Sequence, residues 1–211
     1  MKTTADDSFS SGPRRRLSWD ARHAQLLDAF RDLIRTQDLA DVTLARVAVH
    51  AGVTKPVAYD HFGDLSGLFS EAYRAFESHQ RDVLLRALES APRDLDAVAD
   101  LVAEAYIECW VAEGLELAAV VAALQGSTTL STLRSDAEQA YLEICREALE
   151  PWTGPLVSAS LAAVVGAGDA LARSVMSGSL STAQASSTLA VVVRAVASAS
   201  AVPDATRDRR T

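Results

Sequence analysis

TLARVAVHAGVTKPVAYDHF, residues 43–62, predicts two short helices joined by a tight turn. Thr43 can cap a first helix over residues 44–50, because a threonine hydroxyl accepts hydrogen bonds from the free amides of a helix start. Gly52 follows this helix, and glycine readily adopts the left-handed conformation that ends helices. Thr54 can cap the second helix in the same way. The stretch therefore has the parts of a helix-turn-helix.

The second helix of this motif would offer a surface to DNA, because its N-terminal end enters the major groove in helix-turn-helix proteins. Lys55 can reach a phosphate or a guanine edge, and the hydroxyls of the two capping threonines and of Tyr59 can donate to phosphates. Pro56 and Val57 could touch a thymine methyl group. The predicted DNA-contacting residues are Thr43, Arg46, Thr54, Lys55, Pro56, Val57, Tyr59 and His61.

Two residues beside this surface have more than one interpretation. His61 can donate to a phosphate, or it can pack next to Phe62 inside the domain. Asp60 can accept a hydrogen bond from a cytosine amino group, pair with a nearby arginine, or cap its own helix. The sequence leaves these alternatives open.

The charge of the chain is divided unevenly. Residues 1–66 carry equal numbers of basic and acidic side chains, so the whole net charge of −8 falls on residues 67–211. An acidic surface repels DNA, and we therefore expect DNA contact through the N-terminal part of the chain. There, Arg14, Arg15 and Arg16 form a basic arm that could follow the phosphate backbone or enter the minor groove, or could be a solvated tail.

The rest of the sequence predicts an all-α protein of nine helices without a sheet. Apolar residues recur at three and four residues from Trp19 to Thr36 and again from Asp64 to Leu88, which is typical of amphipathic helices. Breaks are expected at Gly114, Gly126–Thr129, Pro151–Pro155 and Gly178–Ser181. The remaining helix-length segments lack the alternation of strands, and they are 94–112, 115–125, 130–150, 156–177 and 182–201.

The motif and the helices on either side of it, about residues 19–76, resemble the DNA-binding domain of the TetR/AcrR family of bacterial repressors. The body behind them matches this family in length and helicity. One departure is Leu65, where family members usually carry a lysine, so that a phosphate contact is absent there. The features that carry the resemblance are Thr43, Val47-Ala48, Ala51-Gly52-Val53, Thr54-Lys55, Tyr59, His61-Phe62, Leu65 and Leu68-Phe69.

The resemblance implies a transcriptional repressor that binds double-stranded DNA, at a palindromic operator, as a homodimer. In this family the last two long helices pair with their copies, and a small, largely apolar effector bound in the body releases the DNA. The implied domains are a flexible basic arm (1–17), a DNA-binding domain (18–78, motif about 42–61), a ligand-binding and dimerisation domain (79–203) and a tail (204–211).

Aromatic and methionine side chains in the body suit an apolar effector, although each could equally belong to the core. Asp169 and Arg173 could form an intrahelical pair, an interface pair or a ligand clamp. Small residues between Ala162 and Gly168 would permit close helix approach, as a dimer or a plain monomer core requires. The candidate pocket residues are Tyr106, Trp110, Gln125, Tyr141 and Met176.

Enzymatic function is not indicated. The sequence lacks G-x-S-x-G, H-E-x-x-H, a phosphate-binding loop and the paired Cys/His spacing of metal sites. We expect no catalytic residue, cofactor or metal. Cys109 and Cys145 are expected to be reduced thiols, with a disulfide or redox switch as the alternative. A helical adaptor or binding protein without sequence-specific DNA binding is the alternative function.

The sequence also predicts a cytoplasmic protein. Its N-terminus is polar and lacks the apolar core of a signal peptide. The two most apolar stretches, 156–176 and 187–202, are interrupted by Asp169, Arg173 and Arg194. They are therefore too short or too charged to span a bilayer, which takes about 20 apolar residues.

Overall fold

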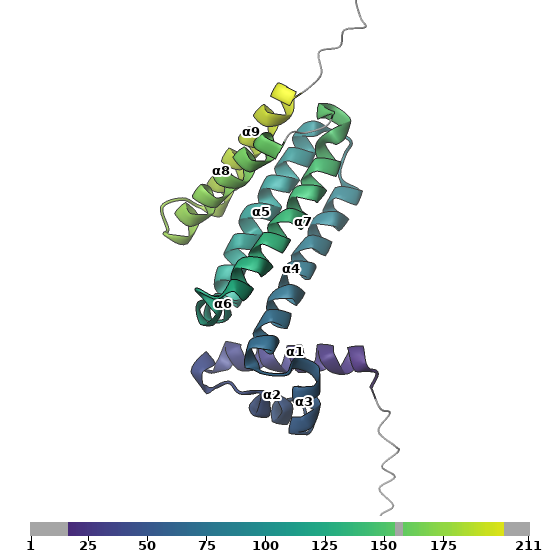
Figure 1. The fold of residues 1–211 in the computed structure, drawn as a ribbon. Helices are drawn as coiled ribbons and strands as arrows, with labels where there is room; N and C mark the ends of the chain where they lie inside the picture. Colours follow the sequence, from purple (N-terminus) through teal and green to yellow (C-terminus); the bar gives the residue numbers. More distant parts are fainter. Residues whose placement is uncertain (1–16, 155–157, 201–211) are drawn as a thin grey trace, which may run out of the picture. The chain divides into compact units, whose positions relative to one another are not determined.

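The computed structural model describes residues 17–154 and 158–200, and over these ranges the chain is α-helical without a strand. Nine α-helices and one short 3-10 helix follow one another in this part of the chain (Figure 1). The predicted all-α class is confirmed. Arg14, Arg15 and Arg16 and the predicted tail lie outside the described residues.

Internal contacts divide the chain into two compact units, the first ending at Leu65 and the second beginning at Ser66. This boundary differs from the predicted one after residue 78. Helix α4 (Leu65–Ser90) is a single uninterrupted helix, and Tyr73 in its first half hydrogen-bonds to Glu113 of the second unit. The first half of α4 therefore belongs to the second unit.

The first unit is a small three-helix domain. Its elements are α1 (Trp19–Thr36), the 3-10 helix (Leu39–Asp41), α2 (Leu44–His50) and α3 (Lys55–Phe62), close to the predicted bounds. Ser18 caps α1, because its hydroxyl accepts a hydrogen bond of 3.1 Å from the amide of Ala21. Leu26 and Phe30 of α1, Val47 of α2 and Ala58 of α3 are completely buried. Burial of one apolar stripe from each helix stabilises this unit.

The second unit contains the remaining helices. Within it, α5 packs against α7, α8 and α9, and α8 packs against α9. The elements that follow α4 are α5 (Leu95–Glu116), α6 (Ala118–Leu124), α7 (Thr128–Thr153), α8 (Ser158–Met176) and α9 (Thr182–Ser200).

The break expected at Gly114 lies at Leu117 instead, and the break expected at Pro151–Pro155 falls inside that range, at Gly154. Helix α5 continues through Gly114 to Glu116, and α7 continues through Pro151 to Thr153. A Cβ atom at position 114 would lie 2.4 Å from the Cε of Met176, so this glycine permits close approach of α8. Pro151 lies in the last turn of α7, where only the end of the hydrogen-bond ladder is affected.

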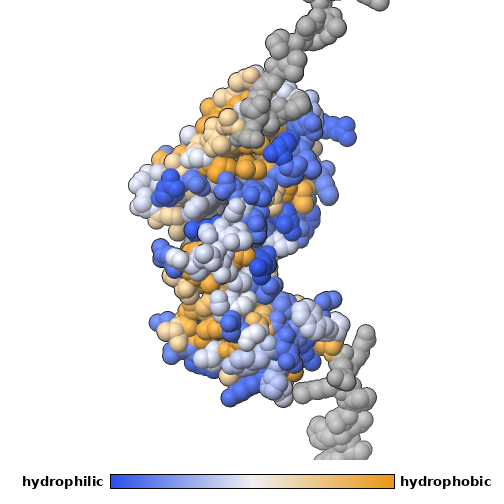
Figure 2. Space-filling model, in the orientation of Figure 1, coloured by the Kyte–Doolittle hydropathy of each residue, from blue (hydrophilic) through white to orange (hydrophobic). Residues whose placement is uncertain are grey.

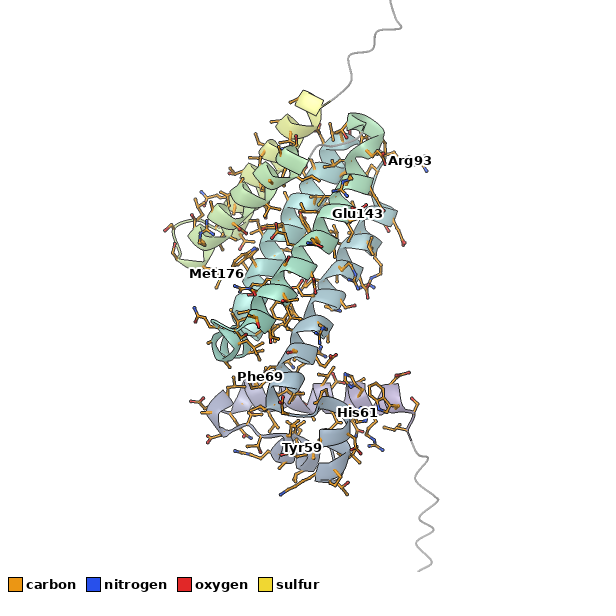
Figure 3. All side chains as sticks on the ribbon, viewed as in Figure 1. Tyr59, His61, Phe69, Arg93, Glu143 and Met176 are labelled. Carbon is orange, nitrogen blue, oxygen red and sulfur yellow. The ribbon has the colours of Figure 1, made fainter. Side chains whose placement is uncertain are left out.

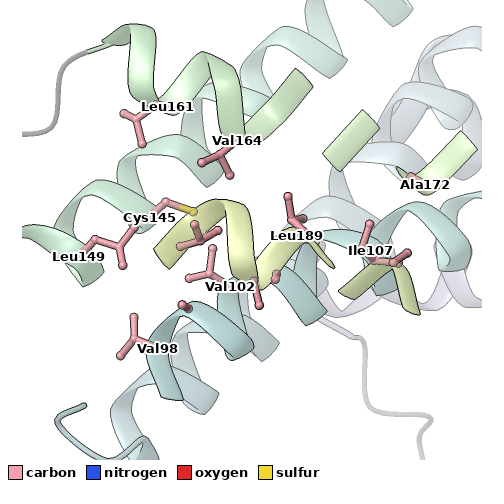
Figure 4. Packing of buried hydrophobic residues seen from close by; sticks show 14 residues of the cluster. Val98, Val102, Ile107, Cys145, Leu149, Leu161, Val164, Ala172 and Leu189 are labelled. Carbon is pink, nitrogen blue, oxygen red and sulfur yellow. The ribbon is translucent and has the colours of Figure 1, made fainter. Parts of the chain in front are cut away.

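The core of the second unit is formed by α5, α7, α8 and α9 (Figure 4). Val102, Ile107 and Leu189 have no exposed surface, and Cys145 is 1% exposed within the same cluster. Cys145 and Cys109 are both free thiols, as expected. Burial raises the pKa of Cys145 to about 12, so this thiol is protonated and unreactive at neutral pH.

Candidate DNA-binding surface and ligand cavity

Helix α3 has one buried face and one exposed face. Ala58 is completely buried and Phe62, four residues later, is 7% exposed, so both lie on the face that packs into the first unit. Lys55 and Pro56 are exposed at the start of the helix. The side chain of Tyr59 is 50% exposed, and Figure 3 labels this residue on α3. The helical period thus turns Lys55, Pro56 and Tyr59 outward, whereas the other two predicted residues of α3, Val57 and His61, are half-buried.

The turn between α2 and α3 is held by several hydrogen bonds. Gly52 has a φ of 67°, and the amide of Val53 donates to the carbonyl of Ala48 at 2.9 Å. The side-chain amide of Gln25, on α1, donates to the carbonyl of Ala51 at 2.9 Å. These contacts fix the direction in which α3 leaves the turn.

The two threonine caps differ. The Thr43 hydroxyl accepts a hydrogen bond of 3.2 Å from the amide of Arg46, as predicted. Thr54 occupies the cap position of α3, but its hydroxyl makes no capping hydrogen bond. Both threonines are exposed, and a hydroxyl proton can rotate toward a phosphate.

Arg46 is exposed, and its guanidinium group already makes two hydrogen bonds within the first unit. Its guanidinium donates to the carbonyl of Asp41 at 2.8 Å and to the Oε1 of Gln37 at 2.5 Å. These bonds hold the charge at the junction of α1 and α2. Arg46 and Lys55 both line a shallow depression on the first unit.

His61 belongs to an aromatic cluster of the first unit. Its ring centroid lies 4.5 Å from that of Trp19, and His23 lies 5.1 Å from Trp19 and 4.8 Å from Phe62. The Nδ1 of His61 is buried without a hydrogen-bond partner among the described residues. Burial, followed by the charge of His23, lowers the pKa of His61, whereas Asp60 raises it. The structure therefore favours the packing interpretation of His61; the contribution of Trp19 and His23 to this cluster was not predicted.

The second unit contains a partly open cavity of about 310 Å³. Of the predicted pocket residues, Tyr106, Trp110 and Tyr141 line it, whereas Gln125 and Met176 are exposed and do not. Met176 instead packs at Gly114. The other lining residues are Tyr73, Glu77, Gln80, Arg81, Leu84, Ala105, Cys109, Glu113, Arg134, Ala137, Glu138, Ala140, Ile144 and Asp169.

Hydrogen bonds orient two tyrosines of the cavity. The Tyr106 hydroxyl donates to the Oδ1 of Asp169 at 2.6 Å, and the Tyr141 hydroxyl donates to the carbonyl of Val102 at 3.0 Å. Their ring centroids lie 5.0 Å apart. A Cβ at Gly168 would lie 2.4 Å from the ring of Tyr106, so this glycine allows the ring to lie against α8. Asp169 thus pairs with Tyr106 across two helices, while Arg173 is exposed.

A charged network occupies the other side of the cavity. Glu113 accepts hydrogen bonds from Tyr73 at 3.0 Å and from Arg134 at 2.5 Å. The Arg134 guanidinium also lies 5.8 Å from the centroid of the Trp110 ring. Burial, followed by the charge of Glu113, raises the pKa of the neighbouring Glu77. Sequence reasoning missed these charged residues, although Glu113 continues the three- and four-residue spacing of Tyr106, Cys109 and Trp110.

Helices α8 and α9 expose small and apolar side chains. Ala162, Ala163 and Gly166 are exposed on α8, and Val191 on α9 is 58% exposed. Hydrophobic residues reach the visible surface of the body in Figure 2.

By length and composition alone, the stretch Ala159–Met176 would also suffice to cross a bilayer, and 28% of it is buried. That criterion is weak, because core helices of soluble proteins also meet it.

The sequence of the N-terminal part of the chain is similar to that of known regulatory proteins. Residues 26–72 match the model of the family described as "Bacterial regulatory proteins, tetR family". The HTH-type transcriptional regulator BetI of Klebsiella pneumoniae is 35% identical over 71 residues, which are 34% of this chain and 36% of that protein. BetI of Escherichia coli O17:K52:H18 is 30% identical over 102 residues, or 43% of this chain and 52% of that protein. The matches thus span between about a third and a half of these relatives.

Solved structures share the fold over most of the chain. A TetR-family transcriptional regulator from Streptomyces coelicolor superposes with a TM-score of 0.65 at 19% identity, covering 87% of this chain and 83% of that one. The fatty acid degradation regulator FadR from Bacillus halodurans gives 0.56 at 18% identity, covering 84% and 93%. At such identities the likeness extends the common fold from the first unit to the helical body.

Proposed function

This chain belongs to the TetR family of bacterial regulatory proteins, and on that premise we propose that it is a ligand-responsive transcriptional repressor. As a homodimer it binds a palindromic operator, and a small molecule in the body releases it from the DNA. Such a protein works in the cytoplasm, where bacterial DNA lies. The exposed face of α3 is the observation that carries the proposal.

Helix α3 supplies the DNA contacts. Lys55, Pro56 and Tyr59 share its exposed face, while Ala58 and Phe62 anchor the opposite face. Lys55 provides a charge for a phosphate or a guanine edge, Pro56 an apolar contact, and Tyr59 a hydroxyl donor. Thr43 and Thr54 flank this face with exposed hydroxyls at the starts of α2 and α3. Arg46 adds positive charge nearby and keeps its bonds to the α1–α2 junction.

Dimerisation occurs through α8 and α9. Exposed small residues at 162, 163 and 166 allow another helix to approach closely, and the exposed Val191 offers apolar surface to it. Removal of this surface from water favours association. A twofold dimer presents two α3 helices to two half-sites about one helical turn of DNA apart, which is why the operator is palindromic.

The cavity of the second unit holds the effector. Its volume of about 310 Å³ lies at the lower end of ligand pockets, about 300–1,000 Å³, and its aromatic walls favour a ligand with an apolar part. The effector prefers a conformation whose two α3 helices do not match the half-sites. By thermodynamic linkage, operator and effector weaken each other's binding by the same factor.

Selection from a random DNA pool with the full chain tests this proposal, followed by fluorescence anisotropy of the enriched sequence at several salt concentrations. We expect a twofold symmetric sequence whose affinity falls steeply with salt. Lys55→Ala and Tyr59→Ala should each weaken binding by about 10- to 100-fold, the loss of one specific contact. Arg93→Ala is the matched control, because it removes one exposed charge from the second unit.

Two outcomes would overturn the proposal. One is a pool in which no sequence is enriched, which would favour the helical adaptor. The other is normal operator binding by both α3 variants, which would place the DNA contact elsewhere. Circular dichroism and dimer mass must be unchanged in the variants.

A further inference from the structure

We propose that the ligand of the cavity is an organic cation, an ammonium group on an apolar or aromatic body, with Glu77 and Asp169 as its counter-charges. The inference rests on the proposed function only in taking this cavity as the effector site. It assigns a chemical class to the effector, and it is carried by the charges and rings that line the cavity.

The lining is rich in carboxylates. Four acidic side chains face two guanidinium groups, those of Arg81 and Arg134, so the ionised lining carries an excess of negative charge. The Arg134 guanidinium lies 2.5 Å from the Oε1 of Glu113, and this ion pair neutralises the charge of one carboxylate. A bound anion would have to compete with Glu113 for Arg134 while facing the other acidic groups. A cation meets the opposite situation, because it reduces the excess.

Glu77 and Asp169 are the half-buried carboxylates of the lining to which no described arginine is bonded, whereas the remaining one, Glu138, is exposed. Asp169 accepts its 2.6 Å hydrogen bond from the neutral hydroxyl of Tyr106, which orients the carboxylate and leaves its charge in place. Glu77 is half-buried; burial, followed by the charge of Glu113, raises its pKa, and the Tyr73 hydroxyl and the charges of Arg134 and Arg81 lower it by less. A cation would relieve the unfavourable surroundings of the Glu77 carboxylate, and it would find the Asp169 carboxylate already oriented by Tyr106.

Aromatic rings complete the cation site. Trp110, Tyr106 and Tyr141 line the same cavity, and the faces of such rings attract cations. The Trp110 ring already has the Arg134 guanidinium at 5.8 Å from its centroid. A positive charge is thus accommodated against a ring of this cavity within the protein itself. The rings also provide the apolar surface that the rest of the ligand requires.

Isothermal titration calorimetry of the full chain, with three probes of nearly equal size, tests the inference without DNA. The probes are benzyltrimethylammonium, its neutral isostere neopentylbenzene, and the anion 3-phenylpropionate. We expect the cation to bind at least about tenfold more tightly than the other two, the scale of one carboxylate or ring contact with a desolvated cation. Equal or tighter binding of the neutral isostere or of the anion would overturn the inference.

Two variants locate the counter-charges. Glu77→Gln and Asp169→Asn should each weaken the cation about tenfold and leave the neutral isostere unaffected. Glu89→Gln is the matched control, because Glu89 is an exposed residue of the same helix as Glu77 and does not line the cavity. If both variants fold normally by circular dichroism and bind the cation as the wild type does, the proposed counter-charges are wrong. Should one variant unfold, the other decides.

The pH dependence gives a second readout. The charge of benzyltrimethylammonium does not change with pH, so any change of affinity reports on the protein. Since the pKa of Glu77 is raised, cation affinity should increase as the pH rises through that pKa, and Glu77→Gln should abolish this increase. A chain that binds the cation but selects no operator would contradict the proposed function alone. A chain that selects an operator but ignores the cation would contradict this inference alone.

Discussion

The first unit and the helical body build their functional surfaces from opposite kinds of sequence information. In the first unit, the proposed DNA-contacting residues lie within 20 residues of one another, and the period of α3 alone turns Lys55 and Tyr59 outward. In the body, the hydrogen bond from Tyr106 to Asp169 joins residues 63 positions apart, and that from Tyr73 to Glu113 joins residues 40 apart. A local pattern can specify the first surface, whereas only packing of four helices assembles the second.

Phe62→Ala should give the largest difference in stability between the first unit and the helical body. Phe62 anchors α3 in the core of the first unit, and removal of a buried phenylalanine ring costs about 3–5 kcal/mol. Hydrogen exchange by mass spectrometry should show lost protection in α1, α2 and α3 and retained protection in α5 and α7. Val49→Ala, at a position 72% exposed on α2, is the control. Equal loss of protection in both units would mean that they do not differ in this way.

Gly168→Ala tests the body in turn. The new Cβ would lie 2.4 Å from the Tyr106 ring, so the ring must move and its bond to Asp169 must weaken. We expect a loss of about 1–3 kcal/mol of stability, the usual cost of overpacking, with hydrogen exchange increased in α5 and α8 only. Glu104→Ala, at an exposed position of the helix that carries Tyr106, is the control and should be tolerated. If the two substitutions behave alike, the close approach of Tyr106 to α8 is unimportant.

His61→Phe should give the smallest effect, and it concerns pH. Because the pKa of His61 is lowered on folding, the unfolded chain binds the proton more tightly. The stability contributed by neutral His61 is therefore complete above the usual histidine pKa of 6.5 and is lost as the pH falls below it. Phenylalanine keeps a ring beside Trp19 but cannot titrate. Urea unfolding at pH 7.5 and 5.5 should show a smaller loss in the variant; an unchanged difference would exclude His61 as a source of acid sensitivity.

Prediction from sequence succeeded where the signal was local. Thr43 predicted the start of α2, and its hydroxyl caps that helix. Prediction from sequence failed where the same residue type fits two different structural roles. Gly114 resembled a helix break, but it lies two residues inside the end of α5, where its missing side chain makes room for Met176. His61 had two open interpretations, and its ring contact with Trp19 favours packing inside the domain over phosphate contact. Trp19 lies 42 positions earlier in the chain, so a local pattern could not reveal this contact.

The sequence by itself determined the helical class, the helix-turn-helix and the outward face of α3, because each depends on the order of residues within one or two helical turns. Only the tertiary structure decided which side chains share the cavity. Tyr106, Trp110 and Tyr141 line it, whereas Gln125 and Met176 do not, and Glu77, Glu113 and Arg134 join from three helices. Spacing along one helix fixes the face on which a residue lies, but the neighbours of that face are set by how the other helices pack against it.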